Sequence, residues 1–554
     1  MTMRRKATPV VLLATAALAM TGCAKSDRES GGDSSGGSSS GSSYKDTFTF
    51  GAAGAPAMFD PFYATDGETF RVTRQIFDGL VSIKPGTADL APGLAEKWES
   101  SSDGKDWTFH LREGVKFTDG TEFNAQAVCD NFERMFSQNK VAAGGPAGYW
   151  ADTMGAFKGD ADPLYTGCKA TDAKTVVLSI SKATSKFPAA LSLSSFSMQS
   201  PKALKDGDAN NVKAQGEGFV YPKNAYNPVG TGPYKLEKYD EANKTVTLVT
   251  NDSYWGEKPK TKKLVFKIIP DESTRRQELQ AGSIDGYDLP NPVDWKGLED
   301  DGNKVEVRDA FNLLYVGLNP EKNPKLKDQK VRTALNMAIN RDQLVKTQLP
   351  EGATVATQFE PETVDGYNKS LKAPEYNPEE AKKVLNGLTL TFAYPSEVSR
   401  PYMPDPQKIH QAITADLEKA GVKVNTVTKQ WNGGYLDGVY NGQFDAFMLG
   451  WTGDYNSSDN FIGHFFGNAA TNDFHTKATS FGQQLADELA KDDGIVDEAQ
   501  RTAAYEQTNQ KIMEWLPGLP ISHSPPAIVV NKNVEGLVVS PLTAEEFSTV
   551  RVKK

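Results

Sequence analysis

The chain has 554 residues, of which 38% are hydrophobic and 24% are charged, and its net charge is −10. This composition is ordinary for a globular protein, and the length allows more than one hydrophobic core. An acidic chain without a basic block is a poor partner for nucleic acid, so nucleic-acid binding is not expected. From residue 46 onward no stretch is long and apolar enough to span a bilayer, so we expect a soluble body.

Residues 1–22 have the pattern of a signal peptide. Basic residues at 4–6 precede an apolar run at 10–20, which is too short for a mature transmembrane helix. Residues 20–23 (Met-Thr-Gly-Cys) resemble a bacterial lipobox, which predicts that Cys23 carries a lipid; an ordinary secretory signal is the alternative. Removing the three basic residues takes the net charge from −10 to −13. The expected location is the extracytoplasmic face of the cell membrane, attached through the lipid.

A low-complexity segment follows the lipobox. Residues 24–44 are almost all Ser, Gly and charged residues, which cannot bury enough apolar surface to fold. We therefore expect residues 23–44 to form a lipidated Cys and a flexible tether, with a reach of roughly 25 Å.

The cysteine count favours one disulfide. With Cys23 lipidated, Cys129 and Cys168 remain, and an even number in an oxidising compartment predicts a bond between them. Free, buried thiols are the alternative. No Cys-x-x-Cys pair or Cys/His cluster indicates a metal site, and no cofactor is expected.

The body of the chain alternates between predicted strands and helices. Helices are predicted to begin after the capping residues Asn124 and Asp271, the second ending at Gly282. A strand, a helix and a second strand at 388–427 form a βαβ unit, which implies a partly parallel sheet and an α/β fold class. The other predicted elements are strands at 47–51, 107–112, 175–180, 245–249, 264–269 and 315–319 and helices at 331–339 and 498–515.

Residues 446–461 are the strongest candidate for a ligand-binding site. Residues 446–449 are apolar on both faces and predict a buried strand, after which the chain breaks into Trp451, two glycines and Asp454. Open α/β folds place their ligand sites in such loops. Asp454 would offer a carboxylate beside the aromatic wall of Trp451. The alternative is that Asp454 only caps a turn or helix.

Several motifs resemble one receptor family. Residues 449–454 (Leu-Gly-Trp-Thr-Gly-Asp), with Asp-Asn-Phe at 459–461, are similar to the cleft segment of dipeptide-binding proteins. These belong to the family 5 extracellular solute-binding proteins, which feed ATP-binding-cassette importers. The resemblance covers nearly everything from residue 46 to the end. Its other motifs are residues 58–61 and 74–81 near the start, the signature at 94–123 and the Gly-Thr-Gly-Pro-Tyr turn within 227–234.

This resemblance implies a periplasmic-binding-protein-like fold of the class II type. Two lobes would enclose a cleft, and an extra domain would be inserted into the first lobe. The implied boundaries are 45–83, 222–305 and 522–554 for the first lobe, 84–221 for the inserted domain and 306–521 for the second lobe.

The resemblance also implies a ligand site. Asp454 would bind the α-amino group of a peptide. Arg400, in a Ser-Arg-Pro-Tyr-Met-Pro stretch that resembles the family's Arg-Pro-Tyr segment, would bind the α-carboxylate. Trp451, Gly453 and Tyr402 complete the expected set. A carboxylate and a bidentate Arg would pair both charges of a free peptide, which are costly to bury alone. A surface salt bridge is the alternative for Arg400.

One departure leaves the ligand open. The dipeptide pattern usually has Asp-Pro two or three residues past the binding Asp, whereas this chain has Ser457-Ser458. An oligosaccharide- or metal-chelate-binding receptor of the same fold is therefore the alternative. Its aromatic platforms would be Trp451, Tyr149, Trp150 and Trp431, each of which could equally belong to the core.

Catalytic motifs are hard to find. No Gly-x-Ser-x-Gly, His-Glu-x-x-His or Walker loop occurs, and the five histidines are scattered. We therefore expect a non-enzymatic receptor, monomeric and lipid-anchored, that passes short peptides to the membrane subunits of an ABC importer.

Overall fold

The computed structural model describes residues 43–215, 218–373, 375–396, 398–431 and 434–554. The predicted signal peptide, Cys23 and the tether before residue 43 lie outside the described residues. Within the described part of the chain, no helix combines the length and hydropathy needed to cross a bilayer.

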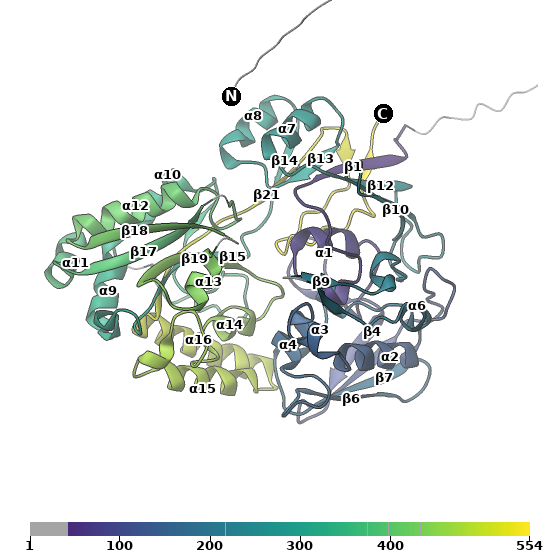
Figure 1. The fold of residues 1–554 in the computed structure, drawn as a ribbon, viewed down its shortest axis with the longest axis horizontal. Coiled ribbons are helices and arrows are strands. Elements are labelled where there is room, and N and C mark those ends of the chain that lie inside the picture. Colours follow the sequence, from purple (N-terminus) through teal and green to yellow (C-terminus); the bar gives the residue numbers. More distant parts are fainter. Residues whose placement is uncertain (1–42, 216–217, 374, 397, 432–433) are drawn as a thin grey trace, which may run out of the picture. The chain divides into compact units, whose positions relative to one another are not determined.

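Two large mixed sheets organise the described chain (Figure 1). The chain crosses from one sheet to the other at residues 308–311 and 524–526. The first sheet has the order β10 (Tyr234–Asp240), β11 (Thr245–Thr250), β12 (Lys263–Ile268), β1 (Thr47–Ala52), β13 (Gly286–Asp288), β21 (Ala527–Val530) and β14 (Lys304–Val307). The second has the order β16 (Thr354–Val355), β20 (Gly518–His523), β15 (Asn312–Leu318), β19 (Ala446–Thr452), β17 (Thr389–Ser396) and β18 (Lys423–Gln430).

A third, antiparallel sheet lies within residues 84–221. Its strands are β4 (Ala95–Ser100), β5 (Asp106–Leu111), β7 (Thr175–Ile180) and β6 (Tyr165–Ala170), in that order. Helix α2 (Ala125–Phe136) is preceded by Asn124, whose side chain accepts a hydrogen bond from the Ala127 N–H, as expected of a helix cap. A disulfide joins Cys129 of α2 to Cys168 of β6, with Cα atoms 5.2 Å apart. The helix is thus linked covalently to the edge strand of this sheet.

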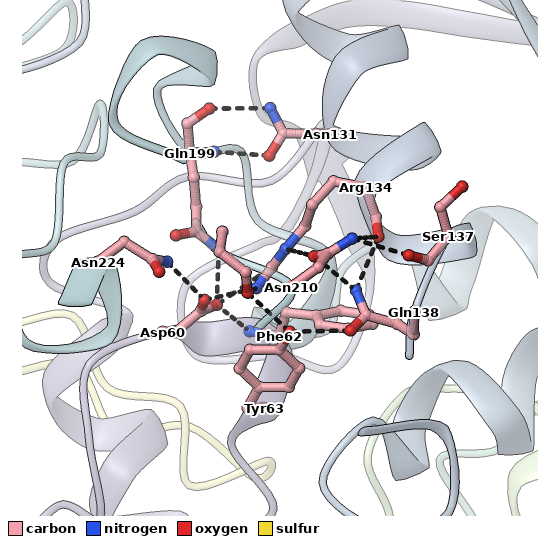
Figure 2. Close-up of polar contacts among 11 residues, drawn as sticks. Asp60, Phe62, Tyr63, Asn131, Arg134, Ser137, Gln138, Gln199, Asn210 and Asn224 are labelled. Atoms are coloured by element: carbon pink, nitrogen blue, oxygen red, sulfur yellow. Dashed lines mark hydrogen bonds and ion pairs between the residues drawn. The ribbon is translucent and has the colours of Figure 1, made fainter. Parts of the chain in front are cut away.

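A buried polar network joins helix α2 to the segment that follows β1 (Figure 2). Asp60, which is fully buried, forms an ion pair of 2.7 Å with Arg134 of α2. Gln199 and Asn224 also donate to the Asp60 carboxylate, at 2.7 and 2.9 Å. The Arg134 guanidinium lies 4.7 Å from the Tyr63 ring centroid. Because a buried carboxylate is stable only with such partners, the two regions are held together firmly.

The remaining helices cover the sheets. Helix α12 (Pro406–Lys419) connects β17 to the parallel strand β18, so the predicted βαβ unit is confirmed. Asp271 caps α7 (Glu272–Gln280), and Gly282 follows it with a φ of +71°, both as predicted. Other helices are α1 (Gly67–Thr73), α4 (Gly148–Met154), α5 (Lys186–Ala190), α9 (Gln329–Ala338), α15 (Gly482–Asp493) and α16 (Glu498–Trp515).

The structure corrects the prediction that the strand at 446–449 ends before the glycine. Strand β19 continues through Gly450, Trp451 and Thr452, which pair with the first residues of β15. Glycine usually weakens a strand, but at position 450 it leaves room for a packed side chain, because a Cβ at Gly450 would overlap the ring of Tyr402.

Candidate ligand-binding site

Two parallel strands bring the predicted charged residues to one edge of the second sheet. β17 and β19 pair in parallel, with Ala393 opposite Phe447. Arg400 follows the last residue of β17 by four positions, and Asp454 follows the last residue of β19 by two. Carboxyl ends of parallel strands share an edge, so both side chains leave the sheet on the side where open α/β folds bind ligands.

Tyr402 fixes the turn that carries Arg400. The Arg400 N–H donates to the Met403 carbonyl at 3.1 Å, and the Met403 N–H donates back at 2.9 Å. Between them Tyr402 is only 6% exposed, packs over Gly450 and belongs to the hydrophobic core of the second sheet. Burial raises the pKa of Tyr402 to about 12. The structure therefore places this predicted ligand residue in the core, where it supports the site.

Arg400 is half-buried, and its charge is largely uncompensated. Its guanidinium carbon lies 4.4 Å from the centroid of the Trp431 ring, a favourable cation–π distance. Its Nε is buried without a hydrogen-bond partner. Among the described residues, no Asp or Glu oxygen lies within 4 Å of the guanidinium. Arg400 is thus available to an incoming anion.

Asp454 is also half-buried and has only neutral hydrogen-bond partners. The Tyr149 hydroxyl donates to Asp454 Oδ1 at 3.2 Å. The Asp454 N–H donates to Asn460 Oδ1 at 2.8 Å. Burial raises the pKa of Asp454 to about 6, although the Tyr149 hydrogen bond and the positive charge of Arg74 oppose the rise. A cation bound here would lower this pKa and stabilise the charged form.

Arg74 and Tyr149 bring two other regions to Asp454. Arg74 directly follows α1 and donates to the Thr543 carbonyl at 3.2 Å. Burial lowers the pKa of Arg74, and its charge acts on Asp454. Tyr149 of α4 packs edge-on against Phe70 of α1, with ring centroids 5.6 Å apart. Three regions of the chain therefore meet around one carboxylate.

Asn460 and Gly453 set the shape of the loop around Asp454. Asn460 Oδ1 also accepts from the Trp451 indole at 3.4 Å, and Trp451 stacks on His464 with centroids 3.9 Å apart. Burial lowers the pKa of His464 to about 4, so this ring is neutral. A Cβ at Gly453 would overlap the Phe311 ring, so the close approach there requires glycine.

The remaining aromatic candidates differ in exposure. Trp150 is fully buried and donates to the Ala156 carbonyl at 2.9 Å, so it is a core residue and offers no stacking surface. Trp431 lies under Arg400. Within the described ranges, no three His, Cys, Asp or Glu side chains are grouped so that they could hold a metal ion.

The sequence predicts Asp454, Arg400, Trp451, Gly453 and Tyr402 as ligand residues, but it does not predict the residues that contact Asp454. It indicates Tyr149 only as a possible sugar platform and Arg74 only as part of a motif. Asn460, six residues past Asp454, could have been suspected because Asn side chains often hold loops through backbone N–H groups.

Two large mixed sheets joined by two crossovers, with a third, antiparallel sheet beside them, are the architecture of two-lobed periplasmic binding proteins. Among solved structures, the dipeptide-binding protein from Pseudoalteromonas sp. SM9913 in complex with Met-Leu is 27% identical, with a TM-score of 0.74 over 92% of this chain and 100% of that chain. The predicted fold is thus confirmed.

The family is also shown. Residues 89–473 match the family model for bacterial extracellular solute-binding proteins, family 5 Middle, so this chain belongs to that family, as the resemblance indicated. It is 33% identical to the dipeptide-binding protein of Escherichia coli (strain K12) over 525 residues, 92% of this chain and 95% of the relative. It is 30% identical to the heme-binding protein A of Haemophilus influenzae over 571 residues, 99% of this chain and 100% of the relative.

Proposed function

We propose that this solute-binding protein is a receptor for short peptides, which it binds in the cleft between its lobes and delivers to the membrane subunits of an ABC importer. In this proposal residues 45–83, 222–305 and 522–554 form the first lobe, 84–221 the inserted domain and 306–521 the second lobe. The protein acts as a monomer and performs no catalysis.

One observation carries this proposal: a carboxylate and a guanidinium, neither of which forms a salt bridge among the described residues, lie at the same edge of one sheet. Asp454 has a pKa near 6 and neutral hydrogen-bond partners. Arg400 has an aromatic partner and, among the described residues, no carboxylate within 4 Å. A free peptide offers an ammonium to the first and a carboxylate to the second, which would pair all four charges.

Removing Asp454 should remove the binding of the α-amino group. Truncating one partner of a buried charge pair costs about 2–5 kcal/mol, so Asp454→Ala should weaken peptide binding roughly thirty-fold or more. Asp437→Ala is a matched control, because Asp437 is an exposed carboxylate of the same lobe. Acetylating the peptide's amino terminus should cost a similar factor in the wild type and little more in Asp454→Ala, since both changes remove one contact.

Calorimetry with a di- to pentapeptide library, beside cello- and xylo-oligosaccharides and heme, decides between ligand classes. Heme is included because one relative is a heme-binding protein. Tight binding of a sugar or of heme with no response to peptides would refute the peptide proposal. Equal affinity for free and acetylated peptides would leave the receptor class intact and remove Asp454 from its role.

We also propose that Cys23 carries a lipid that holds the receptor at the extracytoplasmic face of the membrane. The support is the lipobox-like run followed by a Ser/Gly-rich segment. Cys23→Ala should release the protein into the medium. Retention of this variant in the membrane fraction after a high-salt wash would contradict the proposal.

A further inference from the structure

We propose that the inserted domain positions the loop that holds Asp454, and that the ion pair between Lys186 and Asp459 is the main contact through which it does so. Residues 453–460 are called the binding loop below. In this account Asp454 is held for ligand binding where the inserted domain contacts the second lobe. The inference rests on the proposed function and adds positioning residues to it.

The inserted domain is first of all fixed to the first lobe. Arg134 of the inserted domain and Asp60 of the first lobe form the buried ion pair of Figure 2, surrounded by amide donors. Breaking such a pair is strongly unfavourable, because it leaves an uncompensated buried charge. Contacts of the inserted domain with the second lobe therefore join the first lobe to the second.

Three residues of the binding loop contact the inserted domain. Asp459 Oδ2 lies 3.6 Å from the Lys186 ammonium, and both side chains are about one-fifth exposed, 19% and 20%. Asp454 accepts the hydrogen bond from Tyr149. Tyr455, only 6% exposed, belongs to the second lobe but packs into a hydrophobic core formed by the inserted domain together with first-lobe residues from 58–81. The loop is thus held near both of its ends.

A second contact lies beside the first. Asp493, at the end of α15 in the second lobe, accepts from the Ser185 N–H at 2.9 Å and from the Ser185 hydroxyl at 2.6 Å. It also accepts from the Thr184 hydroxyl at 2.6 Å. Three consecutive residues of the inserted domain, 184–186, therefore contact two carboxylates of the second lobe, those of Asp493 and Asp459.

The charges explain why Lys186 matters. Burial disfavours the charged form of Lys186, but the nearby Asp459 and Asp493 outweigh it and raise its pKa. Burial raises the pKa of Asp459, which Lys186 opposes and Asp493 reinforces. Without the lysine, Asp459 would lose its ion-pair partner while the unfavourable charge of Asp493 remained, and the binding loop would move away or take up a proton. Gly463 permits the present position of Asp459, because a Cβ there would contact its carboxylate.

The first test needs no ligand. Hydrogen exchange of peptides covering residues 453–460 should be faster in Lys186→Met than in the wild type. Lys186→Arg should restore protection, because it keeps the charge. Lys182→Met is the matched control, since Lys182 is exposed on the same domain, and should leave exchange unchanged. Equal exchange in the wild type and Lys186→Met would overturn the inference.

The second test asks whether Lys186 acts through Asp454. Lys186→Met should weaken binding of a free dipeptide about ten-fold and leave binding of its N-acetylated form unchanged, because only the former uses Asp454. Equal weakening of both would indicate a general structural effect and overturn the inference. If the wild type bound no peptide, the proposed function would fail, while the exchange measurement would still decide the role of Lys186.

Discussion

The sharpest consequence of the site is a pH dependence of peptide affinity. Asp454 has a pKa of about 6 in the empty protein, set by burial against the opposing effects of Tyr149, Arg74 and Asn460 and the reinforcing charge of Asp152. A bound ammonium favours the carboxylate and lowers this pKa. Below pH 6 the receptor must therefore lose a proton before it binds. The affinity should fall about ten-fold between pH 7 and pH 5, since a free group of pKa 6 is mostly protonated at pH 5.

Calorimetry in buffers of different ionisation enthalpy measures both parts of this prediction. At pH 6 about half a proton should be released for each free dipeptide bound. Asp454→Asn should bind more weakly and show no pH dependence between pH 5 and 7, because it carries no titrating group at this position. The N-acetylated dipeptide should behave likewise with the wild type. A wild-type affinity that stays constant from pH 7 to 5 would refute the assignment of Asp454 to the amino group.

Three further predictions concern stability. Thiol labelling of the denatured, unreduced protein should find Cys129 and Cys168 unreactive, and reduction should lower the free energy of unfolding by about 3–4 kcal/mol; two reactive thiols would mean no bond. Arg134→Met should lower the free energy of unfolding, measured in urea, by about 3–5 kcal/mol, because Asp60 is left buried without its ion-pair partner. A loss below about 1 kcal/mol would contradict this. Burial raises the pKa of Glu360 to about 8, above its unfolded value, so its ionisation destabilises the fold as pH rises; Glu360→Gln should raise Tm more at pH 8 than at pH 5.

The elements whose signals are local could be predicted from the sequence. Asn124 and Asp271 cap helices because their side chains accept from N–H groups three residues on, which a pattern of caps and apolar periodicity reveals. Gly450 misled the prediction, because a glycine in an apolar run usually marks a break. Its actual role, making room for the Tyr402 ring, depends on a residue 48 positions earlier in the chain.

The candidate site likewise has some residues that the sequence predicts and others that it does not. Asp454 and Arg400 were found because they lie in motifs that resemble a family, and β17 and β19 then bring them to one edge. Tyr149 is 305 residues from Asp454, so no spacing in the sequence could pair them. The contact of Lys186 with Asp459 likewise depends on how the inserted domain meets the second lobe, which no local pattern encodes.

Native mass spectrometry of the purified mature protein tests the central claim most directly. The peptide-receptor account predicts a one-to-one complex whose extra mass, released on denaturation, fragments as short peptides with free amino termini. Asp454→Ala purified in the same way should carry none, and Asp437→Ala should carry the same peptides as the wild type. A released oligosaccharide or heme, or peptides bound equally by Asp454→Ala, would contradict the account.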